Sequence, residues 1–220
     1  MIGRFFKRGN DDVALPRERG PLELALGHAM EIDTLGIQAE MAAGEPAMGP
    51  PEGGPFIVVA HGVAPLDADT ELHRYYDNDH RLLQAIVPVG GTQADVQDVS
   101  LYAPWDSVAP MGQGEWQRWT GPNGLIGQAD YDADGIHFAR YWGDGPEKAP
   151  LVEFTETVDD GEAVRRIHQR CMLYSRPVGS GEEMLLINIE RDLDDRSVSE
   201  GSSIEFLIGY GLGPADLRKV

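Results

Sequence analysis

Apolar and polar side chains alternate along several segments of this chain at the spacing of β-strands. Residues 151–158, 184–190 and 204–210 place apolar side chains at alternate positions, and successive side chains of a strand point to opposite faces. We therefore predict three half-buried strands here. Residues 56–63 and 82–89 are more continuously apolar, which is typical of strands covered on both faces. We expect these two at the centre of the fold.

Two further segments need a choice between helix and strand. Residues 164–174 place some apolar side chains at helical spacing, but the segment lies between two turn-forming clusters as one arm of a hairpin, so we interpret it as a long strand. Residues 107–119 form the best candidate helix of the middle region, although Pro110, Gly112 and Gly114 weaken it.

Clusters of Gly, Asp and Asn recur at short intervals from residue 56 to the C-terminus. Short strands separated by such turns predict antiparallel pairing. The predicted fold class is therefore α+β and β-rich, with mainly antiparallel sheet and a few short helices. Residues 1–20 are interpreted as a flexible basic arm, and residues 21–220 as a single β-rich globular domain. Within that domain the Pro- and Gly-rich residues 45–55 are expected to form a long loop.

The charge balance narrows the classes of partner. The chain has 18 basic and 37 acidic side chains, a formal charge of −19, so repulsion from phosphates argues against nucleic acid. The single Cys171 excludes an internal disulfide framework and a cysteine zinc cluster. No apolar run has the length of a signal peptide core or of a membrane span. We therefore expect a cytoplasmic protein that is not transmembrane.

An acidic triplet forms the first half of a calcium-binding loop. Asp130, Asp132 and Asp134 alternate and are followed by Gly135, as in loops whose carboxylates converge on a hard cation. The twelfth position would be Tyr141, which cannot supply the required bidentate carboxylate. We therefore favour a β-hairpin tip and keep the three aspartates only as metal-ligand candidates.

The stretch Asp67–His80 holds two histidines, two tyrosines and five acidic residues. Histidine and carboxylate together can bind metal or transfer protons. On a strand, however, His73 and Tyr75 share one face while Arg74 and Tyr76 share the other, so we favour cross-strand pairing in a hairpin. The chain has no nucleophile elbow, P-loop or dinucleotide-binding motif, and we expect no cofactor and no catalytic residue.

Two regions are candidate partner-binding surfaces. Trp105, Trp116 and Trp119 fall close together in a Pro- and Gly-rich region, and exposed tryptophans commonly anchor partners, whereas buried ones fill cores. Phe5 and Phe6 stand beside Lys7 and Arg8. This basic and hydrophobic arm could contact an acidic partner, or make peripheral contact with anionic lipid through residues 1–8.

The order of several short motifs resembles the YjfK-like family of uncharacterised bacterial proteins. The matching landmarks are Phe5-Phe6-Lys7, Pro16–Leu22, Asp33-Thr34-Leu35, Arg74-Tyr75-Tyr76, Leu83-Gln84, Trp116 and Arg140-Tyr141-Trp142, with a closing Leu-Gly pair. Members tend to be encoded beside a phage-shock-protein-A-like membrane-remodelling protein, a small membrane protein and enzymes resembling glutathionylspermidine synthetases. The resemblance implies an adaptor role in an envelope-stress system.

Three hypotheses follow for the function. The first is a non-enzymatic cytoplasmic interaction or adaptor protein that binds a protein partner with a basic or helical surface. The second is a metal-dependent or acid–base enzyme that uses Asp67–His80 together with Asp130–Asp134, which requires the two segments to meet in space. The third is a protein that binds a small cation of the polyamine type through acidic and aromatic side chains.

Overall fold

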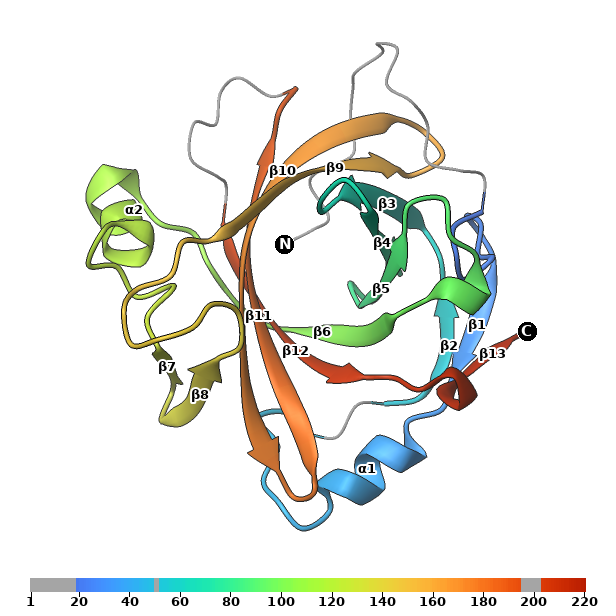
Figure 1. The fold of residues 1–220 in the computed structure, drawn as a ribbon, viewed down its shortest axis with the longest axis horizontal. Helices are drawn as coiled ribbons and strands as arrows, with labels where there is room; N and C mark the ends of the chain where they lie inside the picture. The colour runs from blue at the N-terminus through green and yellow to red at the C-terminus, as the bar shows by residue number, and fades with distance from the viewer. Residues whose placement is uncertain (1–18, 50–51, 195–202) are drawn as a thin grey trace.

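A closed barrel of antiparallel strands dominates the computed structural model, which describes residues 19–49, 52–194 and 203–220. Figure 1 shows the strands arranged around a common interior. In order around the barrel they are β3 (Ala60–Pro65), β4 (Thr70–Tyr76), β5 (Leu82–Pro88), β6 (Asp98–Val108), β12 (Ile204–Gly211), β11 (Gly181–Asp192), β10 (Val164–Val178) and β9 (Val152–Asp159). The pairing of β9 with β3 closes the ring.

Smaller elements cover the outside of the barrel. A separate sheet has the order β13 (Leu217–Lys219), β1 (Ala29–Ile32) and β2 (Gly54–Ile57), and the hairpin of β7 (Asp130–Ala133) and β8 (Ile136–Arg140) pairs with β10. The helices are α1 (Leu35–Met41) and α2 (Gly112–Thr120), with short 3-10 turns η2 (Gln93–Asp95) and η3 (Pro214–Asp216). Within the described ranges, no helix has the length and apolar character needed to cross a membrane.

The three strands predicted from alternation are confirmed as strands, but only β9 is half-buried, whereas β11 and β12 are buried on both faces over much of their length. Residues 151–158, 184–190 and 204–210 lie in β9, β11 and β12, apart from Leu151, which precedes β9. The strand interpretation of residues 164–174 is also confirmed, because this segment belongs to β10, which pairs with β11 over most of its length.

Three expectations need correction. The helix expected over residues 107–119 begins only at Gly112, because β6 stays paired with β12 as far as Val108. The apolar run 56–63 is split between the end of β2 and the start of β3. The label α+β is only roughly right, because the helices are two short surface elements and most of the strands close into one barrel.

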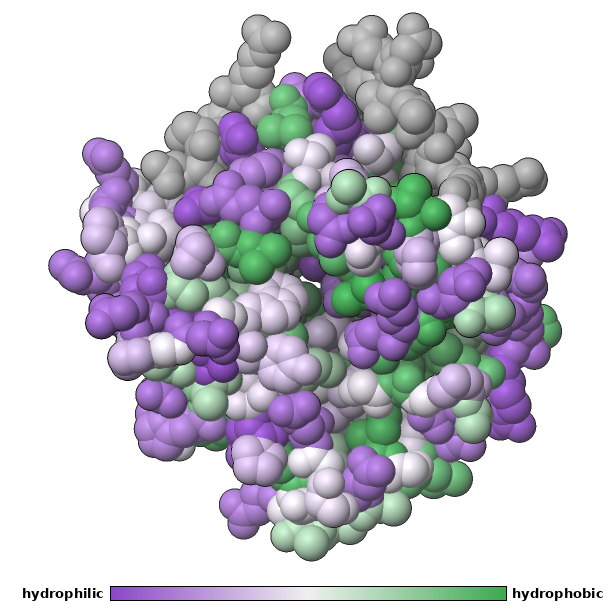
Figure 2. Space-filling view, in the orientation of Figure 1, coloured by the Kyte–Doolittle hydropathy of each residue, from purple (hydrophilic) through white to green (hydrophobic). Residues whose placement is uncertain are grey.

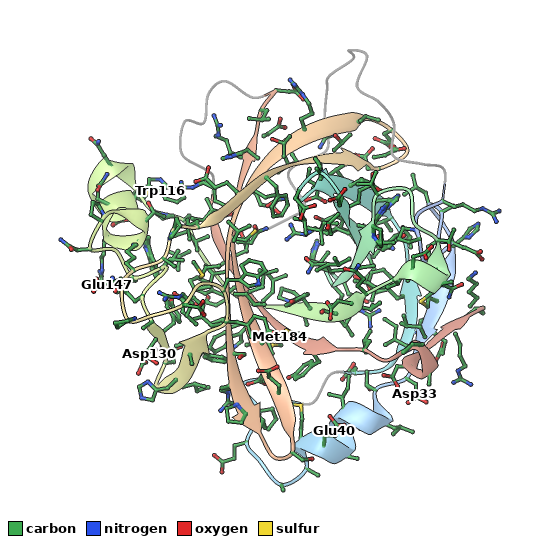
Figure 3. The ribbon with its side chains drawn as sticks, viewed as in Figure 1. Asp33, Glu40, Trp116, Asp130, Glu147 and Met184 are labelled. Atoms are coloured by element: carbon green, nitrogen blue, oxygen red, sulfur yellow. The ribbon has the colours of Figure 1, made fainter. Side chains whose placement is uncertain are left out.

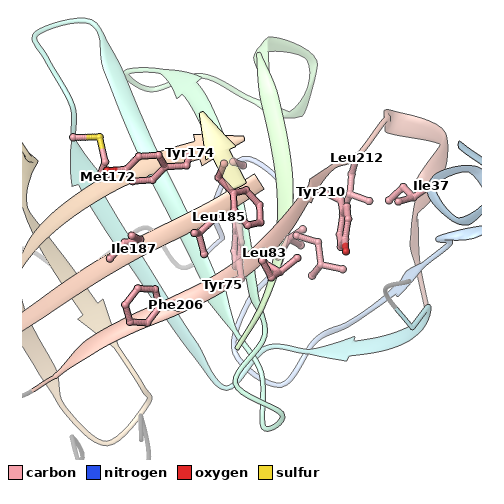
Figure 4. Close-up of a cluster of buried hydrophobic side chains, with 14 of the residues drawn as sticks. Ile37, Tyr75, Leu83, Met172, Tyr174, Leu185, Ile187, Phe206, Tyr210 and Leu212 are labelled. Atoms are coloured by element: carbon pink, nitrogen blue, oxygen red, sulfur yellow. The ribbon is translucent and has the colours of Figure 1, made fainter. Parts of the chain in front are cut away.

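The barrel wall has an apolar core on each side, which explains why β5 is nearly continuously apolar. The larger core includes Leu185, Ile187 and Phe206 and lies between the outer wall and the covering elements (Figure 4). The smaller core takes residues from all eight barrel strands and therefore lies inside: Ala64, Leu72, Leu82, Tyr102, Phe154, Cys171, Leu173, Leu186 and Leu207.

Candidate functional sites: an acidic aromatic pocket and a polar barrel interior

The acidic triplet lies on the β7–β8 hairpin, as the hairpin interpretation predicted. Asp134 and Gly135 have φ values of 53° and 85°, the left-handed backbone that a tight two-residue hairpin turn requires. The backbone N–H of Gly135 donates to Asp132 Oδ1 at 2.8 Å, and Asp132 Oδ2 lies 3.2 Å from His137 Nδ1. Over the described part of the chain, no three His, Cys, Asp or Glu side chains are grouped so that they could hold a metal ion.

The three candidate tryptophans differ in exposure. Trp116 on α2 is only 6% exposed and belongs to the outer core, whereas Trp105 and Trp119 are half-buried. The Trp119 ring meets Phe206 edge to face with centroids 5.9 Å apart. Figure 3 shows Trp116 and Asp130 on the same side of the barrel, and in Figure 2 hydrophilic side chains cover much of this side.

Trp105 and Trp119 share a pocket of about 310 Å³ with the acidic hairpin. Its apolar lining includes Tyr131 and Phe206, and four carboxylates also line it: Asp106, Asp130, Asp132 and Asp134. No described lining residue is basic. Burial, and then the nearby Tyr174 and Asp106, raise the pKa of Tyr131. We call this site the acidic aromatic pocket, and its negative, aromatic lining suits a cationic group.

The remaining candidate partner-binding residues belong to the N-terminal segment of the sequence. Phe5, Phe6, Lys7 and Arg8 lie outside the described residues. The first described residues include Gly20, which is buried and so close to Tyr75 and His61 that a Cβ there would overlap the tyrosine oxygen. Gly20 is thus packed against the outer face of β3 and β4.

The Asp67–His80 stretch alternates as the sequence predicted. His73 and Tyr75 face the outside of the barrel, where His61 Nε2 lies 3.1 Å from His73 Nδ1 and the His61 ring stacks on Tyr75 at 4.5 Å. Burial, and then the neighbouring His73, lower the pKa of His61 to about 3. Figure 1 shows β4 and β7 on different sides of the barrel, so the structure does not bring this stretch to the acidic hairpin.

Arg74 and Tyr76 point into the barrel, where they meet a buried carboxylate. Arg74 is 1% exposed and Glu156 0%. Their closest atoms, Nη1 and Oε2, are 3.4 Å apart, and Tyr76 Oη donates to Glu156 Oε1 at 2.8 Å. Arg74 Nε also donates to Gln84 Oε1 at 3.2 Å. Burial lowers the pKa of Arg74, but interactions with Tyr76, Cys171 and Glu156 outweigh it and leave that pKa above its ordinary value.

A second group of polar side chains continues this network across the interior. Gln169 Nε2 donates to Glu156 Oε2 at 2.8 Å and to Glu190 Oε1 at 3.2 Å, and Asn188 Nδ2 donates to the same Glu190 oxygen at 2.9 Å. Burial, and then the charge of Glu156, raise the pKa of Glu190 to about 6. Burial also raises the pKa of Cys171 to about 11, which keeps it a thiol and makes it a poor nucleophile.

The interior network is a feature that the sequence analysis did not predict. Glu156 lies in β9 between Phe154 and Val158, on the face that the alternation of residues 151–158 predicts to be apolar. A carboxylate in an apolar alternation is the signal that could have identified it, because buried charges need partners. Gly62 is a second signal, since a Cβ there would overlap the Glu156 carboxylate.

Comparison with known proteins identifies the family of the chain. No curated protein and no solved structure matches the chain. One family model matches residues 1–218, nearly the full length. The chain therefore belongs to the family described as "Protein of unknown function (DUF2491)".

Proposed function

We propose that this protein is a non-enzymatic interaction protein that binds a basic protein partner through its acidic aromatic pocket. One observation carries the proposal: two half-buried tryptophans and four carboxylates, from segments that are separate in sequence, line the same pocket of about 310 Å³. The volume suits one or two side chains of a partner. A lysine or arginine side chain matches the lining in both shape and charge.

The energetics favour a cationic side chain that inserts between the aromatic rings. A cation over a tryptophan face gains roughly 0.5–1 kcal/mol when exposed and about 2 kcal/mol when desolvated. The four aspartates add attraction, and the overall charge of −19 speeds the encounter with a basic partner. Tryptophan is also enriched among residues that dominate binding energy. The pocket thus combines an anchor with electrostatic steering.

The resemblance to the YjfK-like family makes the proposal more specific. It suggests a cytoplasmic adaptor in an envelope-stress system, with a phage-shock-protein-A-like protein as the partner. A basic face on a helical partner would complement the acidic aromatic pocket.

The test is a titration of the purified full-length protein with a purified phage-shock-protein-A-like protein from the same genome. The pocket variant is Asp130→Asn/Asp134→Asn, which removes two exposed charges, and asparagine tolerates the left-handed backbone of residue 134. The matched control is Asp69→Asn/Asp79→Asn, which also removes two exposed charges. Asp69 lies in the turn before β4 and Asp79 in the turn after it.

We expect the pocket variant to bind about tenfold more weakly, because two attractive charges are lost, and the control variant to bind nearly as tightly as the wild type. Higher salt should weaken binding of the wild type more than that of the pocket variant. Equal losses in both variants would mean that only the overall charge matters. That result, or no binding by the wild type, would overturn the proposal.

A further inference from the structure

One end of the barrel opens into a second pocket, which we call the mouth pocket. Its volume is about 480 Å³, within the usual range for small-molecule sites, which often occupy barrel mouths. Inward-facing residues of β5, β6, β10 and β11 form its floor: Gln84, Ile86, Ser100, Tyr102, Leu173 and Met184. Helix α1 borders it with Glu40; Figure 3 labels Glu40 and Met184.

The lining of the mouth pocket is aromatic and negatively charged. Carboxylates come from Glu40, Asp98 and Glu182, and Tyr102 and Trp142 supply aromatic rings. None of the described lining residues is Lys, Arg or His. The Ser100 hydroxyl donates to Asp98 Oδ2 at 3.0 Å, which orients that carboxylate. An ammonium group is attracted both to carboxylates and to aromatic faces, so this lining selects a cation over an anion.

Gln84 supplies an independent indication of a ligand. It is 6% exposed, and its Oε1 accepts from Arg74 Nε. The arginine has only donors, so it fixes which end of the amide faces it. The opposite end of the amide, its NH₂ group, makes no side-chain hydrogen bond within the described ranges of the chain. Gln84 lines the mouth pocket, so a ligand oxygen there is in a position to accept from this NH₂ group.

We propose that the mouth pocket binds a small organic cation, in which an ammonium group is joined by an apolar chain to a hydroxyl or carbonyl oxygen. The ammonium group lies at the acidic rim near Asp98 and Glu182. The apolar chain packs against Leu173 and Met184, and the oxygen accepts from the Gln84 amide. This small-molecule site is separate from the acidic aromatic pocket, since the two share no lining residue.

Three probe molecules of similar size test the chemistry by calorimetry with the full-length protein. Aminohexanol carries both groups, hexylamine lacks the oxygen, and hydroxyhexanoate replaces the ammonium group with a carboxylate. We expect aminohexanol to bind best, hexylamine about threefold to tenfold more weakly because Gln84 then stays unpaired, and hydroxyhexanoate at least about tenfold more weakly. If hydroxyhexanoate binds as well as aminohexanol, or if neither amine binds, the proposal is wrong.

A pair of glycine substitutions tests the location. Gly211 lines the mouth pocket, and a Cβ there would meet nothing within 4 Å, so Gly211→Leu should fill the pocket without a clash. Gly114 on α2 is equally open, so Gly114→Leu is the matched control. We expect Gly211→Leu to weaken aminohexanol binding at least about tenfold and Gly114→Leu to leave it unchanged. Unchanged binding by a folded Gly211→Leu variant would overturn the assignment.

A charge variant keeps the test decisive if Gly211→Leu does not fold. Asp98→Asn/Glu182→Gln removes two charges from exposed side chains at the rim. We expect aminohexanol to bind this variant about threefold to tenfold more weakly, whereas Asp130→Asn/Asp134→Asn leaves its affinity unchanged. If both double variants bind aminohexanol equally, the mouth pocket is not the site.

Discussion

Replacing Arg74 by methionine removes a buried cation from the barrel interior. The guanidinium lies 3.4 Å from the Glu156 carboxylate, donates to Gln84 Oε1 at 3.2 Å and sits 5.0 Å above the centre of the Phe154 ring. Methionine has a similar length and can fill most of the space. The main consequence is therefore electrostatic, because Glu156, which is 0% exposed, loses its cationic partner.

The expected loss follows from the partners that Glu156 keeps. Breaking a buried ion pair by removing one partner costs about 3–5 kcal/mol. Tyr76 Oη and Gln169 Nε2 still donate to the carboxylate at 2.8 Å each, so we expect the lower end, a loss of about 3 kcal/mol in the free energy of unfolding. For a chain of this size that lowers Tm by roughly 6–12 °C.

Urea unfolding at neutral pH, followed by circular dichroism, measures the loss. The double variant Arg74→Met/Glu156→Gln should recover at least about 1 kcal/mol relative to Arg74→Met, because the carboxylate that lost its cationic partner is then neutral. Arg118→Met on the exposed surface of α2 is the control and should change stability by less than about 0.5 kcal/mol. A loss below about 1 kcal/mol for Arg74→Met, or strictly additive losses in the double variant, would refute the reasoning.

Two further predictions concern pH. The pKa of Glu190 in the folded state, about 6, exceeds its ordinary value of 4.5, so its ionisation reduces stability as pH rises through 6. Glu190→Gln should therefore stabilise the fold by about 1–2 kcal/mol at pH 8 and very little at pH 4.5, as urea titrations at the two pH values would show. The pKa of His61 is lowered from 6.5 to about 3, so stability falls as pH decreases below 6.5. His61→Phe should remove up to about 1.4 kcal/mol per pH unit from that slope; an unchanged slope between pH 6 and pH 4 would contradict this origin.

The sequence by itself determined the local structure. A strand turns successive side chains to opposite faces, so alternation was enough to identify β9, β11 and β12. The same rule separated His73 from Arg74. The hairpin turn at Asp134 also followed from residue type alone, because its left-handed backbone favours Gly, Asn and Asp.

Only the tertiary structure decided which strands pair and which faces lie inside. Apolar core residues lie on both faces of the barrel wall, so periodicity could not distinguish the interior from the outer core. The contact between Arg74 and Glu156 joins residues 82 positions apart and depends on closure of the ring through β3 and β9. Trp105 and the acidic hairpin were both conspicuous in the sequence, but they share a pocket because the hairpin pairs with β10. Long-range pairing of this kind is set by the packing of the whole chain, and no local pattern of residues encodes it.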